Sequence, residues 1–158
     1  MGLTLSDDFA KLKRDLAALG DIDPVGLNKK IGEVLVSSTK KRFEDEKGPD
    51  GKAWPKSYRA SASGGQTLSD KGRLKNSISY HADAKGVEEG TNVKYAHVHQ
   101  EGMEIKVKNA KYLRFQVGGG WAKKKKVTIP KRPFLGIDDD DMEEIDGTVI
   151  DHIKGRSS

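Results

Sequence analysis

The sequence predicts an α+β fold, in which a curved antiparallel β-sheet or small sandwich carries a long N-terminal helix packed across it and a C-terminal helix. Three observations favour this class. Apolar residues recur at helical spacing near both ends of the chain, the middle alternates in strand fashion between turn signals, and no internal repeat is visible. The 158 residues suffice for one compact domain, so we expect a single domain over residues 1–158.

Two helices are expected first. Residues 1–22 contain an N-cap signal at Ser6, followed by apolar residues at helical spacing from Phe9 to Leu19. Residues 24–46 begin with Pro24, which suits the first position of a helix, and carry one apolar stripe. A helix of that length spans ~30 Å, the diameter of a small domain, so we expect it to lie across a flat surface.

A loop and a β-rich core follow. Residues 52–66 are rich in Ser, Gly and Ala, which predicts a mobile loop. Within the core at 68–135, we expect a helical turn at Leu74, a hairpin of 77–82 with 87–91, and a short helical or irregular piece at 95–100. A second hairpin of 103–107 with 112–117, a flexible basic loop at 118–126 and a strand at 127–129 complete the core.

The last element is a helix over residues 138–154. Asp138 is placed to cap it, and acidic residues in the first turn favour the positive end of the helix dipole. We expect five residues in the core: Phe43, Leu74, Ile78, Tyr95 and Phe134.

Composition excludes several classes of protein. The chain has no cysteine, which excludes a disulfide framework, thiol catalysis and cysteine-ligated zinc. No apolar run is long enough to span a bilayer, and residues 1–20 lack the apolar region of a secretory signal, so we expect a soluble protein without a membrane partner. Hydrophobic residues make up 34% of the chain, below the usual ~45–50%, so the core is expected to be thin.

Charge is strongly segregated along the chain. Residues 105–137 contain no acidic residue but many lysines, including the run 123–126, and the acidic run 138–141 follows directly. Such blocks suit a charge-complementary contact between subunits. The candidate interface residues are Lys106, Lys108, Lys123, Lys124, Lys125, Lys126, Asp138, Asp139, Asp140 and Asp141. Two other interpretations stay open: both blocks are solvated faces that keep the protein soluble, or segment 106–132 binds nucleic acid. Trp121 is the one aromatic available for stacking beside the lysine run.

No motif indicates catalysis, a cofactor or a metal. His97, His99 and Glu101 would share one face if their segment were a strand, which leaves a metal-dependent hydrolase as a third hypothesis. In a helical turn these side chains would diverge, which favours packing roles. The Asp138–Asp141 run does not have the spacing of a calcium loop, and neither a P-loop nor a G-x-S-x-G elbow is present. We therefore expect no catalytic residue, no cofactor and no metal site.

Four segments occur in an order that resembles one family. After Arg42-Phe43 come residues 49–55 (PDGKAWP), 68–78 (LSDKGRLKNSI), 90–102 (GTNVKYAHVHQEG) and 129–136 (IPKRPFLG). Together they resemble the phage virion morphogenesis family, the tail-completion and head-tail joining proteins of Mu-like, contractile-tailed phages and prophages. The resemblance extends from about Leu27 to Ile150. The chain departs from the family pattern at Asp70-Lys71-Gly72 and in the basic insert 109–126.

The resemblance implies a non-enzymatic assembly protein. Such a protein would join or terminate the tail at its head-proximal end as a ring of subunits, in contact with tail-tube or neck and connector proteins. It would be assembled in the bacterial host cytoplasm and reside in the tail or neck of the virion. The resemblance and local chemistry together assign mainly structural roles to a set of motif residues: Trp54, Leu74, Tyr95, His97, His99, Gly102, Arg132, Pro133 and Phe134.

Overall fold

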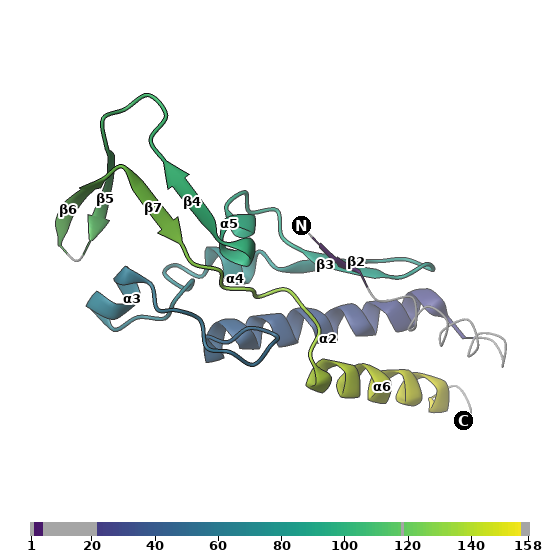
Figure 1. Ribbon diagram of the computed structural model, residues 1–158. Helices are drawn as coiled ribbons and strands as arrows, with labels where there is room; N and C mark the ends of the chain where they lie inside the picture. The colour runs from purple at the N-terminus through teal and green to yellow at the C-terminus, as the bar shows by residue number, and fades with distance from the viewer. Residues whose placement is uncertain (1, 5–21, 118, 156–158) are drawn as a thin grey trace. The chain divides into compact units, whose positions relative to one another are not determined.

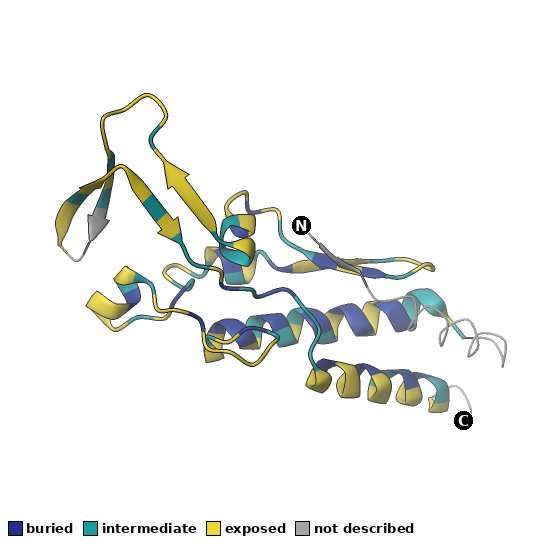
Figure 2. Ribbon diagram, viewed as in Figure 1, coloured by how far each residue is buried: buried dark blue, intermediate teal, exposed yellow. Residues whose placement is uncertain are grey.

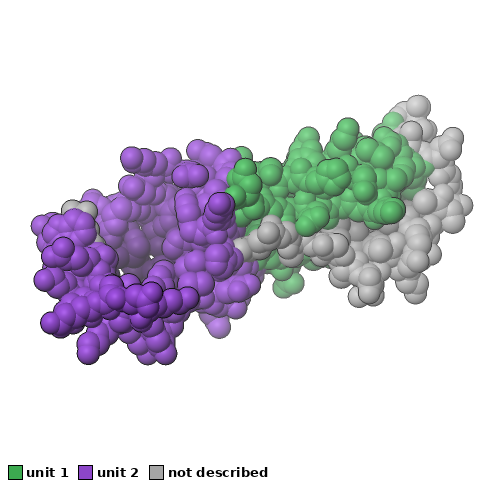
Figure 3. Space-filling model, turned by 90° about the horizontal axis from the view of Figure 1, so that it is seen from above, with its two compact units in different colours: residues 1–40, 78–92, 135–158 green, residues 41–77, 93–134 purple. Residues whose placement is uncertain are grey.

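The computed structural model confirms an α+β fold built from helices and short antiparallel strands (Figure 1). It describes residues 2–4, 22–117 and 119–155. These residues form two compact units, shown in Figure 3: unit 1 comprises residues 1–40, 78–92 and 135–158, and unit 2 comprises residues 41–77 and 93–134. The long helix α2 (Pro24–Asp45) supplies residues to both.

Unit 1 contains a three-stranded antiparallel sheet in the order β1-β3-β2 and the C-terminal helix α6 (Asp139–Lys154). Its strands are β1 (Gly2–Thr4), β2 (Ser79–Ala82) and β3 (Val87–Gly90). The β2–β3 hairpin confirms the first expected hairpin, with Ala82 opposite Val87. Residues 2–4 are a strand where the sequence suggests a helix, because their backbone pairs with β3. The remainder of that expected helix, residues 5–21, lies outside the described residues.

The core of unit 1 is formed by α2, β3 and α6. It consists of Leu27, Ile31, Leu35, Val87, Ile145 and Val149, all buried. Gly32 lies on the same helix against the ring of Tyr80, where a Cβ atom would collide with the ring. A glycine at this position therefore permits the close approach of helix and strand.

The described residues of unit 2 form three short helices and two separate two-stranded sheets. The helices are α3 (Tyr58–Ser63), α4 (Arg73–Asn76) and α5 (Ala96–Glu101). Helices α4 and α5 were both expected, at Leu74 and at 95–100. Helix α3 falls inside the expected mobile loop 52–66, where the Ser57 hydroxyl accepts a hydrogen bond from the Ala60 N–H and caps the turn.

The strands of unit 2 pair differently from the sequence expectation. Strand β4 (Met103–Lys106) pairs with β7 (Lys126–Ile129), and β5 (Leu113–Val117) pairs with β6 (Gly120–Lys124). The expected pairing of 103–107 with 112–117 is therefore wrong, and the expected loop 118–126 contains strand β6. The tight turn at Gly119 (φ +75°) gives residues 113–117 a nearer partner than β4.

The β5–β6 pair, a two-stranded ribbon, thus lies in the chain between the two strands of the β4–β7 ribbon. Lys106 and Lys126 face each other at the end of the β4–β7 ribbon, and the Val107 N–H donates to the Lys125 carbonyl at 3.1 Å. Residues 107–125, which carry the β5–β6 ribbon, are thus inserted between the paired ends of β4 and β7 (Figure 1). Figure 2 shows that the described residues of both ribbons are largely exposed. The described strands therefore form three small open sheets, where the sequence suggested one curved sheet or a sandwich.

Candidate interaction surfaces

Residues from several of the motif segments meet in an aromatic cluster in unit 2. Phe43, Trp54 and Phe134 are buried, with the Phe43 ring centroid 5.4 Å from that of Trp54 and 5.3 Å from that of Phe134. The Phe134 N–H donates to Gln100 Oε1 at 3.0 Å, and its carbonyl accepts from Arg42 at 3.2 Å. Burial confirms the core assignments of Phe43, Leu74, Ile78 and Phe134. The assignment of Tyr95 is wrong, since it is 42% exposed and lies edge-on to His99 at the surface.

Arg132 is a buried cation held by neutral groups. Its Nε donates to the Pro55 carbonyl at 2.6 Å, Nη2 lies 3.5 Å from the Lys56 carbonyl, and its backbone N–H donates to the His99 carbonyl at 2.7 Å. No carboxylate of the described residues pairs with this guanidinium. Burial lowers the pKa of Arg132, which shows that its charge is partly desolvated.

Helix α5 separates the three side chains of the hydrolase hypothesis. His97, His99 and Glu101 lie two residues apart on a helix, so their side chains diverge instead of sharing a face. His97 Nδ1 donates to the Lys94 carbonyl at 2.8 Å. Gly102 ends the helix at φ +75°, and a Cβ atom at this position would lie only 3.0 Å from the backbone nitrogen of Lys131. Among the described residues, no three His, Asp or Glu side chains gather where they could hold a metal ion.

His99 lies beside a cavity of about 540 Å³ that we call the β7 pocket. Apolar walls come from Phe115, Val127, Ile129 and Pro130, and the cationic groups are Lys124, Lys126 and Arg132. Burial, with a smaller contribution from the charge of Arg132, lowers the pKa of His99. The half-buried imidazole is therefore mainly neutral at pH 7, and its buried Nδ1 has no hydrogen-bond partner among the described residues. Thr128 and Tyr58 also line the pocket, and neither was predicted because neither lies in a motif.

The basic segment divides into paired and unpaired lysines. Glu104 binds both Lys106, at 2.9 Å, and Lys126, and these contacts lower the pKa of Glu104 and raise that of Lys106. No carboxylate of the described residues pairs with Lys108 or with Lys123, Lys124 and Lys125. The unpaired lysines are exposed, so they are available to a partner.

One face of the β5–β6 ribbon is cationic and aromatic. Arg114 stands opposite Lys123, and Trp121 lies on the same face two residues away. All three side chains are exposed, and Trp121 is 73% exposed. An indole left in water is uncommon in a monomer and typical of residues that anchor protein interfaces.

In the acidic run 138–141, two aspartates are engaged within the chain and two are exposed. Asp138 caps α6 by accepting from the Asp141 N–H at 2.9 Å, and Asp141 accepts from the Asp138 N–H at 3.0 Å. These two carboxylates satisfy backbone donors of their own helix. Asp139 and Asp140 are exposed and remain candidates for contact with another molecule.

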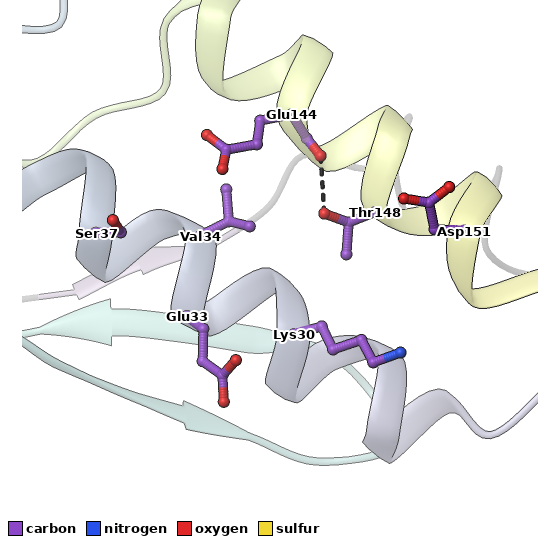
Figure 4. Close-up of a pocket in the computed structure, with 7 residues that line it drawn as sticks. All are labelled: Lys30, Glu33, Val34, Ser37, Glu144, Thr148 and Asp151. Atoms are coloured by element: carbon purple, nitrogen blue, oxygen red, sulfur yellow. Dashed lines mark hydrogen bonds between the residues drawn. The ribbon is translucent and has the colours of Figure 1, made fainter. Parts of the chain in front are cut away.

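Unit 1 also has an open groove between α2 and α6, of about 530 Å³ (Figure 4). Lys30, Glu33, Val34 and Ser37 line it from α2, and Glu144, Thr148 and Asp151 line it from α6. The Thr148 hydroxyl donates to the Glu144 carbonyl at 2.8 Å, so it is satisfied within its own helix. The groove is shallow and mainly acidic at its rim.

The sequence matches the phage virion morphogenesis family over residues 7–154, nearly its whole length. The chain belongs to this family. Searches among curated proteins and among solved structures give no match. Membership of the family assigns the protein to phage assembly and to the virion, in a structural and generally non-enzymatic class. None of the described helices is long and apolar enough to cross a membrane.

Proposed function

We propose that this member of the virion morphogenesis family completes the tail or joins it to the head, without catalysis, as a ring of subunits. The family match supports the assembly role. Assembly through charge is supported because one chain exposes both unpaired lysines and free aspartates, which could meet between two copies. Lys123, Lys124 and Lys125 have no carboxylate partner in the described structure, and Asp139 and Asp140 are free of the capping box.

Contacts of this kind act over about one Debye length, ~8–10 Å at physiological salt, so they set association rate and register more than final affinity. A contact between two different surfaces of the same chain is head-to-tail, and it closes into a ring only if its rotation closes. The ring would contact tail-tube or neck and connector proteins in the tail or neck of the virion, after assembly in the host cytoplasm.

The test replaces Lys123, Lys124 and Lys125 by glutamate in a phage that carries this gene. Lys126 is left intact because it pairs with Glu104. We expect the folded protein to persist, since exposed residues contribute little to stability, and we expect tails without heads or tails of aberrant length by electron microscopy. The matched control replaces three exposed lysines elsewhere, Lys29, Lys71 and Lys85. Normal infectious particles from the first variant would contradict assembly through these lysines.

A nucleic-acid-binding module over residues 106–132 is the second candidate, because Trp121 lies exposed beside Arg114 and Lys123 on one ribbon face. A lysine-rich face that binds phosphates releases counterions, so its affinity falls steeply with salt. Steeply salt-dependent binding to single-stranded DNA that is lost in the Trp121→Ala variant would favour this candidate over subunit docking.

A further inference from the structure

The outer face of α6 combines acidic and apolar side chains. Asp139, Met142, Glu143, Asp146 and Ile150 follow one another at helical spacing and are all exposed. Met142 is 38% exposed at the edge of the face on which Ile145 and Val149 enter the core, and Ile150 is 49% exposed further from that face. A surface helix normally carries polar residues on its outward face, so the exposed parts of Met142 and Ile150 are apolar surface that another molecule can cover.

The β7 pocket offers the complementary chemistry. Its walls are mainly apolar, and the charged groups that line it are all cationic. Lys126 is paired with Glu104, but neither Lys124 nor Arg132 has a carboxylate partner in the described structure. A buried guanidinium held only by carbonyls favours a carboxylate that can share its charge. The pocket therefore suits an apolar side chain with carboxylates beside it.

Met142 fits this description better than Ile150 does. Asp139 precedes Met142 by one helical turn and Glu143 follows it directly, whereas Ile150 has Lys154 one turn ahead. The unbranched thioether of methionine also adapts to an irregular cavity more readily than a β-branched side chain does. Nucleic acid fits less well, because a phosphate backbone brings no apolar group to bury and a single-strand binder presents a series of stacking aromatics.

We propose that the β7 pocket of one copy receives Met142 from helix α6 of a second copy, with Asp139 and Glu143 beside Lys124 and Arg132. This inference rests on the proposed self-assembly and names the surfaces that meet. The pocket belongs to unit 2 and α6 to unit 1, so each copy uses both surfaces at once and the contact propagates from copy to copy.

The absence of cysteine permits a direct test in the full-length protein. One variant carries Thr128→Cys at the pocket and another carries Met142→Cys, and the two are mixed under mild oxidation. We expect their disulfide-linked heterodimer to exceed that of a control pair about tenfold, because a specific contact raises the local concentration of the two thiols. The control pair is Thr128→Cys with Asp151→Cys, an exposed α6 position on the opposite side of the helix from Met142.

A charge exchange provides the second measurement. Lys124→Glu in the first variant and Glu143→Lys in the second should each reduce the heterodimer yield, and the two together should restore it. Equal yields from the test and control pairs, or failure of the exchange to restore the yield, would overturn the Met142 contact. Binding of a labelled oligo-dT that requires Lys124, together with no excess of the Met142 heterodimer, would overturn it in favour of nucleic acid.

Failure of this contact is distinguishable from failure of the proposed function. A Met142→Ala variant that still yields normal virions, with cross-links absent, would remove the Met142 contact and leave the assembly role intact. Virions that form normally when the gene is deleted would remove the assembly role itself.

Discussion

The indole Nε1 of Trp54 donates a hydrogen bond to the carbonyl of Pro133 at 2.9 Å, across 79 residues of chain. The same indole meets the Phe43 ring edge-on, at an angle of 78° between the ring planes. Three motif segments that are far apart in sequence therefore share one cluster in unit 2. Phe43, Trp54 and Phe134 in these segments therefore have a structural role in the core.

Replacing Phe134 by alanine should destabilise the protein by about 3–5 kcal/mol, because a fully buried ring leaves a cavity against Phe43. Chemical denaturation followed by circular dichroism measures the loss. The control is Tyr58→Ala, which removes a ring that is 70% exposed and should change stability little. A loss below about 1 kcal/mol for Phe134→Ala would contradict its place in the core.

The two tryptophans should differ in fluorescence. In Trp121→Phe the remaining Trp54 is 5% exposed, so its emission should be blue-shifted and quenched weakly by acrylamide. In Trp54→Phe the remaining Trp121 is 73% exposed and should show the opposite behaviour. The second variant should also lose about 0.5–1.5 kcal/mol of stability with the Pro133 hydrogen bond. Equal acrylamide quenching of Trp54 and Trp121 in the two variants would contradict the different exposure of the two indoles.

Removing the α6 cap should destabilise the protein. Asp138→Ala leaves the Asp141 N–H without its side-chain acceptor and should cost about 0.5–2 kcal/mol. Thermal unfolding measures the change, and Asp140→Ala is the matched control because its carboxylate is exposed in the same helical turn. Equal effects in the two variants would show that general charge near the helix end, and not the capping box, is what stabilises α6.

His99 should make stability depend on pH. Burial and the charge of Arg132 lower its pKa below the ordinary 6.5, so the unfolded chain takes up the proton first. The contribution of His99 to the free energy of unfolding is therefore fully present above about pH 6.5. It declines as the pH falls from there toward the pKa of His99 in the folded protein. The pKa values of Glu46 and Glu104 are lowered from 4.5, so their contributions decline only at more acidic pH.

Denaturation at pH values between about 7.5 and 5 should show this slope in the wild type and a flatter slope in His99→Gln. The exposed His81→Gln variant is the control. An unchanged slope in His99→Gln would assign the effect to other groups.

Hydrogen exchange should be fast in residues 57–66 and in the β5–β6 ribbon. Helix α3 is short and largely exposed, and a two-stranded ribbon is at best marginally stable in water. We expect low protection in the isolated protein at both places, and increased protection of the ribbon in assembled particles. Protection equal to that of α2 in the isolated protein would contradict this expectation.

Local signals in the sequence predicted most of the helices. Pro24 begins α2, the Asp138 cap begins α6, and the β2–β3 hairpin follows from a short turn between alternating runs. Strand pairing in the basic segment was not predictable in this way, because 103–107, 112–117 and 120–124 are all short and compatible with several registers. Glu89 is fully buried on β3, which an apolar pattern does not predict.

The candidate surfaces were predicted only as charge blocks. Composition identified the lysines and aspartates, but which of them are already engaged depends on three-dimensional neighbours. Glu104 engages Lys106 and Lys126 across two strands, and the capping box engages Asp138 and Asp141. The β7 pocket brings together α3, α5, both ribbons and Arg132, so no single stretch of sequence carries its signal.

The position of the β5–β6 ribbon in the chain has an evolutionary consequence. The chain enters and leaves residues 107–125 next to the facing pair Lys106 and Lys126, and the aromatic cluster around Phe43 and Phe134 contains none of these residues. Insertions and deletions in this arm can therefore change the β7 pocket that it helps to line, while the aromatic cluster stays unchanged.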